Sequence, residues 1–434
     1  MGVGKNLGDE KGKKMKTKLN KFLTTIVLCS MLLVALPAIA AATEDETLDI
    51  YGNANEDDIL DMRDLTFTAR MILRLEDETE LADANYDGRI SVADMTQIGL
   101  IILGRESKLI LVDATDRIVT VNKPVERLVV HHPSTVEAIK VVGAEDRVVG
   151  ICNPINEILF PQMSELPLLG TLGYDIYYEE VFELDPDIFI TPKLPIPGFD
   201  DLVATLEPEI TVVALNFYEP ATMVENIRKL RYILNTEEDG EAFIAFYEGV
   251  INGITEGTAG LSEAEKPRVF LKIAGWTPEA LSTFTDTHQT EIAGGINIAA
   301  DLPGSGFVPE IDTEWLVEQN PDIVTAQIWE VYNPGALGYE VDDNSVTEAA
   351  REEIMAMDAF AGGKAVEEGK VYLYEDELMI TPRFVVGIAY MAKWFHPTLF
   401  SELDPKAIHQ EYLTDFMRID YDLSEHGVFA YPEP

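Results

Sequence analysis

Short apolar runs alternate with amphipathic segments along most of this chain, and this alternation constrains the fold more than any other feature. The runs "RLVV", "RVVGI" and "DIFI" have the length of buried strands, and each is followed by a segment with apolar residues at helical spacing. Strands that alternate with helices form parallel sheets covered on both faces. Two such series, residues 109–221 and 266–432, therefore predict an α/β protein with two parallel-sheet sandwich lobes.

The segment between the two series, residues 222–258, has apolar residues at helical spacing and contains no proline. It predicts one long helix that joins the lobes. Gly240 costs such a helix up to about 1 kcal/mol relative to alanine and is the candidate position for a break. Lobes joined by a helix are expected to close less than lobes joined by loops.

Near the start of the chain, two twelve-residue stretches repeat a pattern of oxygen-bearing residues, "NANEDDILDMRD" and "DANYDGRISVAD". Loops of this length bind Ca²⁺ through alternating side chains and one backbone carbonyl. The predicted ligands are Asn53, Asn55, Asp57, the Ile59 carbonyl, Asp61, Asp64, Asp83, Asn85, Asp87, the Arg89 carbonyl, Ser91 and Asp94. Asp58 stands where the second loop has Gly88, so occupancy of the first loop stays open. An amphipathic segment follows each loop, so residues 48–106 predict a small all-α calcium-binding module; acidic turns between helices are the alternative.

The N-terminus has the pattern of an export signal. Residues 11–21 are cationic and lead into an apolar segment that closes on the small residues of 38–40. This predicts a signal peptide over residues 1–40 and an exported protein, with a retained membrane anchor as the alternative. The net charge of −45 argues against nucleic acid as a partner. Cys29 lies in the predicted signal, so Cys152 is left without a partner for a disulfide in the mature chain.

One local sequence occurs once in each predicted lobe. "EEVFELDPDI", which begins at Glu179, and "EWLVEQNPDI", which begins at Glu314, share a glutamate at the same distance before Pro-Asp-Ile. Two ordinary helix–strand junctions could produce this spacing. The alternative is a pseudo-symmetric pair of exposed glutamates that grips a two-fold symmetric partner.

Parallel α/β lobes bind ligands beyond the carboxyl ends of their strands. In the first lobe this selects His131 and the neighbouring His132, Asn153, residues 191–193 and residues 216–218, and Tyr174 and Tyr178 lie close to the first glutamate. In the second lobe it selects Trp276, Trp329, Tyr332 and Arg383. Aromatic walls with one or two charged groups suit a large planar chelate, and an arginine suits an anionic one. The predicted ligand-binding set is His131, Tyr174, Tyr178, Trp276, Trp329 and Arg383, although packing roles remain the alternative for each aromatic residue.

From about Leu109 to Pro432, the chain resembles the substrate-binding proteins of ABC importers for iron chelates and cobalamin. The matching stretches include "DRIVTVNKPVERLVV", "VVGAEDRVVGI", "ELDPDIFI" and "EQNPDIVTA". The resemblance implies two lobes that face each other across a shallow cleft, with Glu179 and Glu314 docking to a dimeric permease that an ATPase drives. It implies an iron(III) chelate of the siderophore type as ligand, with cobalamin, another corrinoid or haem as alternatives.

Residues 48–106 resemble a type I dockerin, with duplicated calcium loops that each precede one helix. This implies two bound Ca²⁺ ions and docking to a cohesin on a surface protein, at the extracellular or cell-envelope side of the cytoplasmic membrane. Dockerins commonly accompany polysaccharide-degrading enzymes, so an enzyme is the alternative from a different class. The chain has no nucleophile elbow, zinc-helix motif or phosphate loop, and we expect it not to be an enzyme.

Overall fold

The computed structural model describes residues 47–171, 175–193, 198–273, 280–285, 288–303, 307–308, 310–330 and 333–434. Residues 48–434 form one compact unit, which is described below. The predicted signal peptide, residues 1–40, lies outside the described residues. Within the described ranges, no helix has both the length and the apolar character needed to cross a membrane.

Two loop–helix units occupy residues 48–106, as the sequence predicts. Their helices are α2 (Met62–Ile72) and α3 (Val92–Ile102), which pack against each other. Each helix begins with a capping box, in which the N-cap side chain and an aspartate three residues later bond each other's backbone N–H groups. The residue with positive φ also recurs at the equivalent position, Glu56 in one loop and Tyr86 in the other, at φ 55° and 57°.

This small module packs directly against the first lobe and is not a separate domain on a flexible linker. Ile50 forms an antiparallel bridge with Leu111 in the hairpin of β1 (Lys108–Val112) and β2 (Ile118–Asn122). The Tyr232 hydroxyl donates to the Leu60 carbonyl (3.1 Å) and accepts from the Leu60 N–H (3.3 Å). Apolar residues of the module and of the first lobe belong to one buried cluster, so the two share a hydrophobic core.

The first lobe is a four-stranded parallel sheet in the order β4-β3-β7-β8. The strands are β3 (Leu128–Val130), β4 (Val148–Ile151), β7 (Ile188–Thr191) and β8 (Thr211–Ala214). The helices are α4 (Pro133–Val141), α5 (Tyr178–Glu183) and α6 (Phe199–Leu206), with a short hairpin of β5 (Gly170–Thr171) and β6 (Asp175–Ile176). Alternate strand residues pack into different clusters, Ile188 into one and Phe189 into another, because both faces of the sheet are covered.

The second lobe has a five-stranded sheet in the order β11-β9-β13-β14-β15. The prediction of a parallel sheet is confirmed except for β15, which runs antiparallel at one edge. The strands are β9 (Arg268–Lys272), β11 (Ile296–Asn297), β13 (Ile323–Ile328), β14 (Val371–Glu375) and β15 (Ala430–Tyr431). A second, two-stranded pairing joins β10 (Thr283–Phe284) and β12 (Phe307–Val308). The helices are α9 (His288–Ile292), α10 (Thr313–Gln319), α11 (Ser345–Ala356), α12 (Lys364–Glu367), α13 (Glu377–Ile380), α14 (Phe384–Phe395) and α15 (Pro405–Glu411), which continues into a π-helical turn (Tyr412–Phe416).

The prediction of one continuous helix over residues 222–258 is wrong. The segment forms two helices, α7 (Met223–Leu234) and α8 (Glu237–Thr258), separated by Asn235 in the left-handed conformation at φ 54°. Asparagine adopts this conformation at low cost and is a common helix stop. Gly240 is not the break: it lies inside α8, where a Cβ would come within 3.0 Å of Arg231 on α7.

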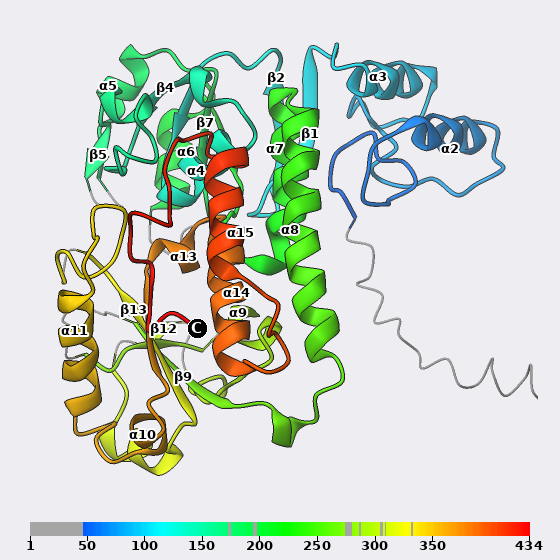
Figure 1. The fold of residues 1–434 in the computed structure, drawn as a ribbon. Coiled ribbons are helices and arrows are strands. Elements are labelled where there is room, and N and C mark those ends of the chain that lie inside the picture. Colours follow the sequence, from blue (N-terminus) through cyan, green and yellow to red (C-terminus); the bar gives the residue numbers. More distant parts are fainter. Residues whose placement is uncertain are drawn as a thin grey trace, which may run out of the picture. The chain divides into compact units, whose positions relative to one another are not determined.

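A single helix still links the lobes, over 22 residues. α8, the long green helix in Figure 1, contacts α4 of the first lobe and α9 and α14 of the second. Asn235 ends α7, and the acidic residues in the first turn of α8 mark the start of a new helix. The apolar spacing continues across this boundary and so does not reveal it.

Candidate functional site

The carboxyl edge of the first-lobe sheet gathers the polar residues that the sequence places after its strands. His131 follows β3 and is buried, and its Nδ1 lies 2.9 Å from the Thr191 hydroxyl at the end of β7. The backbone N–H of His132 donates to Asn153 Oδ1 (2.9 Å), which links the ends of β3 and β4. These residues therefore lie together at one edge of the sheet, and their contact with a ligand stays a prediction.

His131 and His132 have different surroundings. His132 caps α4 at φ 79°, and its Nδ1 lies 2.7 Å from the Ser134 hydroxyl. Burial, together with the neighbouring His131, lowers the pKa of His132 to about 4, so its ring is neutral at physiological pH. The Tyr218 ring lies 5.9 Å from the His132 ring, and the Tyr218 hydroxyl donates to the Lys193 carbonyl (3.1 Å).

The predicted aromatic residues are only partly described. Tyr178, the first residue of α5, is half-buried and packs against the core cluster on one face of the first-lobe sheet, and burial raises its pKa. Trp329 directly follows β13 and is half-buried. Tyr174, Trp276 and Tyr332 lie outside the described residues. Ligand contact by these five residues stays a prediction.

Arg383 has a different environment from the one predicted for it. Its guanidinium is fully buried, and its Nε donates to Glu137 Oε2 (3.0 Å) and Oε1 (3.1 Å). Another nitrogen donates to the Tyr339 hydroxyl (2.6 Å), and a third contacts the carboxylate of Glu377. Arg383 does pair with a carboxylate, but the carboxylate belongs to the protein, because a buried guanidinium is stable only when it is paired.

Glu137 makes this pair a connection between the lobes. It lies on α4 of the first lobe, whereas Arg383 precedes α14 of the second. The Tyr412 hydroxyl, also from the second lobe, donates to Glu137 Oε1 (2.6 Å). His132 caps the helix that carries Glu137, and Glu377 follows β14, so the carboxyl ends of both sheets meet around Arg383. The sequence signal for Glu137, a charged residue within an apolar helix, was overlooked.

Three consecutive acids, Glu375, Asp376 and Glu377, stand at the carboxyl end of β14 and were also overlooked. Burial and the charge of Glu377 raise the pKa of Asp376 to about 8. Burial and the same charge hold the pKa of Glu375 well above its ordinary value. At neutral pH the Asp376 carboxyl therefore favours the protonated state.

Glu179 and Glu314 lie in the first turns of α5 and α10, and both side chains are exposed. Six residues after each glutamate, Asp185 and Asn320 adopt the left-handed conformation at φ 47° and 44°. The aspartates that follow, Asp187 and Asp322, donate their backbone N–H to an arginine carbonyl (2.9 and 2.8 Å). The first arginine directly precedes β3 and the second is the first residue of β9. The repeated sequence is thus also a structural repeat, one copy in each lobe.

The two predicted calcium loops share their internal bonding. Asp64 and Asp94 are fully buried and accept the same pair of backbone N–H groups, at 3.2 and 2.7 Å in each loop. The Oδ1 atoms of Asn53 and Asn85 are buried without a hydrogen-bond partner in the described part of the chain, as expected of inward-facing ligand oxygens.

Other predicted ligands have partners within the protein. Asp57 and Asp61 pair with Arg63 (3.0 and 2.9 Å), and both oxygens of Asp83 accept loop N–H groups. Within the described ranges, no group of three or more His, Cys, Asp or Glu side chains is arranged to hold a metal ion. The oxygens of Asn55, Ile59, Asp87, Arg89 and Ser91 lie in the same two loops, and calcium binding stays a prediction.

Two parallel-sheet lobes, joined by a helix and meeting at the carboxyl ends of their strands, define a bilobal solute-binding protein. The chain belongs to the periplasmic binding protein family, whose family model matches residues 128–378. Because members of this family bind solutes and do not transform them, the polysaccharide-active enzyme considered from the sequence is not supported.

Three known proteins illustrate the similarity. An uncharacterized ABC transporter substrate-binding lipoprotein of Bacillus subtilis, YvrC, is 24% identical over 297 residues, which cover 67% of this chain and 86% of that protein. A cobalamin-binding protein of Halobacterium salinarum is 23% identical over 290 residues, covering 66% and 73%. The crystal structure of the TroA-like periplasmic binding protein FepB from Veillonella parvula matches with a TM-score of 0.60 at 22% identity, covering 74% of this chain and 98% of that one.

Proposed function

We propose that this protein is the exported solute-binding component of an ABC importer, and that it delivers an iron(III) chelate of the siderophore type to a membrane permease. The observation that carries the proposal is the meeting of the carboxyl ends of two parallel sheets around Arg383, within a chain of the periplasmic binding protein family. The similarity to a substrate-binding lipoprotein supports a position outside the cytoplasm.

The candidate ligand contacts are His131, Tyr178 and Trp329, together with Tyr174 and Trp276. Arg383 can reach a ligand only if its pair with Glu137 opens. A corrinoid is the second candidate, because the Halobacterium salinarum relative is named as a cobalamin-binding protein.

A thermal-shift panel of ferric siderophores, haem and cobalamin, with the mature protein and Ca²⁺, tests this choice. A ligand at a hundred times its Kd stabilises the folded state by about 2.7 kcal/mol and raises the Tm. A rise of the Tm with cobalamin alone would identify a corrinoid, and not an iron chelate, as the ligand. No shift with any member of the panel would refute binding of metal chelates.

Docking to a dimeric permease is the proposed role of Glu179 and Glu314, which are exposed at equivalent places on the two lobes. A surface hollow lies beside α10, the helix that carries Glu314. It is lined by Val317, Pro321, Phe360 and Lys364 among others. Charge reversal by Glu179→Lys and Glu314→Lys should abolish chelate uptake by cells while the purified variants keep their ligand affinity. Unchanged uptake by the double variant would refute the docking role.

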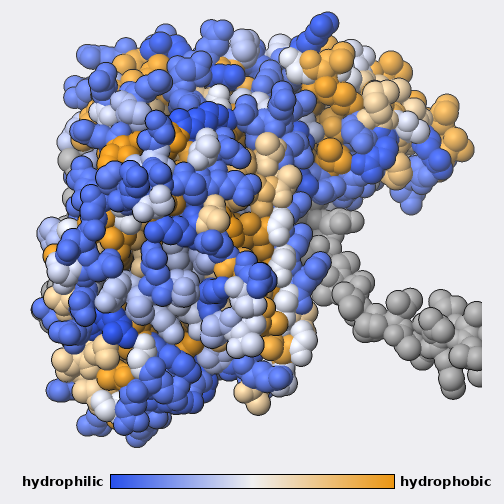
Figure 2. All heavy atoms as spheres, viewed as in Figure 1, coloured by the Kyte–Doolittle hydropathy of each residue, from blue (hydrophilic) through white to orange (hydrophobic). Residues whose placement is uncertain are grey.

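For residues 48–106 we propose the role of a dockerin, which binds two Ca²⁺ ions and a cohesin on a surface protein. Large exposed apolar residues support this role, and Figure 2 shows such residues in orange. They recur at equivalent helix starts, Met62 and Val92 (63% and 68% exposed), and at equivalent helix ends, Leu73 and Leu103 (67% and 65%). Exposed apolar residues at matched positions suit a protein interface.

A pull-down with a type I cohesin, in Ca²⁺ and in excess chelator, tests the dockerin role. Binding should require Ca²⁺ and should weaken when Met62, Leu73, Val92 and Leu103 are changed to serine together. Cohesin binding that chelator leaves intact would contradict the calcium-dependent mechanism.

A further inference from the structure

A chain of side-chain contacts crosses the carboxyl edge of the first-lobe sheet. Asn153, two residues after β4, accepts the backbone N–H of His132, two residues after β3 (2.9 Å). Asn216, two residues after β8, accepts the backbone N–H of Lys193, two residues after β7 (2.9 Å). Tyr218 joins the halves, because its ring lies 5.9 Å from the His132 ring and its hydroxyl donates to the Lys193 carbonyl (3.1 Å). We call these five residues the first-lobe rim.

The hydrogen bonds of the two asparagines fix how their amide groups are turned. A backbone N–H needs an acceptor, so the oxygens of Asn153 and Asn216 face the backbone and the NH₂ groups occupy the other branch of each amide. Within the described part of the chain, neither nitrogen has a hydrogen-bond partner and neither is fully enclosed by protein. Each asparagine is only 7% exposed. The rim therefore holds two oriented N–H donors in nearly buried side chains, where polar groups are normally paired.

His132 adds a third donor to the first-lobe rim. The backbone N–H of Ser134 donates to His132 Nδ1 (3.2 Å), so the proton of the neutral ring is on Nε2. The ring is half-buried, and Nε2 has no hydrogen-bond partner among the described residues. By contrast, both asparagine oxygens, His132 Nδ1 and the Lys193 carbonyl already accept hydrogen bonds. The rim thus offers a ligand N–H groups while its acceptors are occupied.

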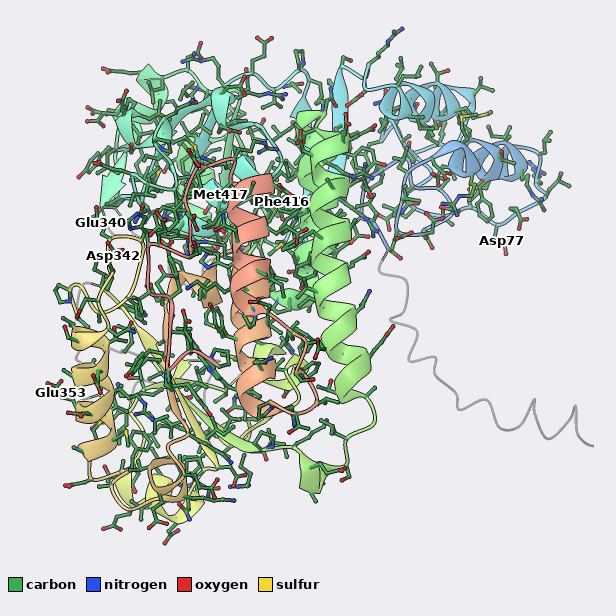
Figure 3. All side chains as sticks on the ribbon, in the orientation of Figure 1. Asp77, Glu340, Asp342, Glu353, Phe416 and Met417 are labelled. Carbon is green, nitrogen blue, oxygen red and sulfur yellow. The ribbon has the colours of Figure 1, made fainter. Side chains whose placement is uncertain are left out.

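Lys193 gives the first-lobe rim a positive charge. Its side chain is exposed and forms no ion pair with a described residue, although acidic residues outnumber basic ones by 77 to 32. Acids are common on the surface of the second lobe, where Glu340, Asp342 and Glu353 are exposed and are labelled in Figure 3. The rim therefore differs in sign from much of the surface around it.

This pattern of donors selects the chemistry of a ligand. An ionised carboxylate accepts hydrogen bonds and donates none, and N–H bonds to a charged acceptor are shorter and stronger than bonds to a neutral one. An amine would find the acceptors of the rim already occupied. Neighbouring strands are about 4.8 Å apart, so a rim across the four strands spans about 14 Å. That length fits oxygens spread around a large chelate better than one small anion.

We propose that the N–H groups of the first-lobe rim bind carboxylate oxygens at the periphery of the transported chelate. This rests on the proposed function and narrows its ligand to iron(III) chelates that carry free carboxylates. The competing explanation is that Asn153 and Asn216 only cap the ends of strands. Aspartate separates the two explanations, because it keeps the oxygen that accepts the backbone N–H and places an anionic oxygen where the NH₂ group was.

The decisive experiment compares two ferric trihydroxamates that differ in one group. One is a linear chelate whose terminal amine is succinylated and so ends in a carboxylate, and the other is its neutral N-acetylated form. Calorimetry with the full exported chain should show at least about tenfold tighter binding of the succinylated form. The double variant Asn153→Asp with Asn216→Asp should remove this preference, and a preference that survives in it overturns the proposal.

The matched control is Asn320→Asp, which should keep the preference. Asn320 Oδ1 also accepts a backbone N–H, that of Lys364 (2.9 Å), but it lies before β13 and not at the carboxyl end of a strand. Asp185 adopts the same left-handed conformation at the equivalent position of the first lobe, so aspartate suits this site. Lys193→Gln changes an exposed side chain and should weaken the succinylated form alone. It carries the test if the asparagine double variant does not fold.

A second pair of probes separates the first-lobe rim from the proposed function. Tricarballylate and its neutral triamide are compared by thermal shift at millimolar concentration and constant ionic strength. Stabilisation by tricarballylate alone, lost in the double variant, supports the rim even if both chelates fail to bind, and in that case the iron-chelate function fails. Equal binding of the two chelates overturns the rim and leaves the transport function intact. Failure of both probe pairs overturns both.

Discussion

Replacing Glu137 by glutamine should destabilise the whole bilobal unit, because it removes the partner of a fully buried guanidinium. The Glu137 and Arg383 side chains are 1% and 0% exposed, and the distance between Oε2 and Nε is 3.0 Å. Removing one partner of a buried pair costs about 3–5 kcal/mol, because the other charge stays buried. Arg383 keeps its contact with Glu377, so we expect the lower end, about 3 kcal/mol.

Urea unfolding followed by tryptophan fluorescence measures this loss. The double variant Glu137→Leu with Arg383→Met should recover most of the stability, since it buries apolar groups and no charge. Glu368→Gln breaks an exposed pair with Lys370 and should leave the unfolding midpoint unchanged. Unfolding of Glu137→Gln at the wild-type urea midpoint would contradict a role of the pair in holding the lobes together. A double variant that is less stable than both single variants would contradict it as well.

Further measurements test other parts of the molecule. Tyr232→Phe removes both hydrogen bonds to Leu60 and should lower the free energy of unfolding by about 1–3 kcal/mol. The loss should appear as faster proteolysis of residues 48–106, with Tyr390→Phe as the control. Equal proteolysis rates in the two variants would contradict a shared core. Burial raises the pKa of Asp64 from 3.8 to about 6, so the calcium-free module should lose stability as pH rises through 6, and added Ca²⁺ should remove this dependence in thermal melts. Gly387→Ala should destabilise, because its Cβ would lie 2.2 Å from the Leu378 carbonyl, whereas Gly249→Ala in α8 meets nothing within 4 Å and should stabilise by up to about 1 kcal/mol in urea unfolding. Small-angle scattering should show little contraction on ligand binding, because α8 spans both lobes; a large contraction would contradict this.

The features that could be predicted were those that one segment expresses by itself. The buried strands of both lobes, the duplicated loop–helix units and the repeated helix–strand junctions all follow from apolar periodicity, capping residues and turn residues. The helix break at Asn235 was missed because apolar spacing continues across it, although asparagine before an acidic turn carried the signal.

The candidate site was predictable only as a set of strand ends. Position after a buried strand predicted that His131, His132, Asn153 and Thr191 lie at the carboxyl edge of the sheet. The contacts of His131 with Thr191 and of His132 with Asn153 came only from the structure. The local sequence could not identify the partner of Arg383. An arginine before a helix can face a ligand, solvent or another side chain with the same local sequence.

The sequence alone determined that the chain forms two sheet-centred lobes and a duplicated loop module. A strand that is buried on both faces is apolar along its length, and this pattern can be read from a few consecutive residues. The tertiary structure decided which charges meet. Glu137 and Arg383, which pair in the interior, are 246 residues apart in the chain. Electrostatic energy depends on distance in space and on burial, and neither quantity is expressed in the local pattern of residues.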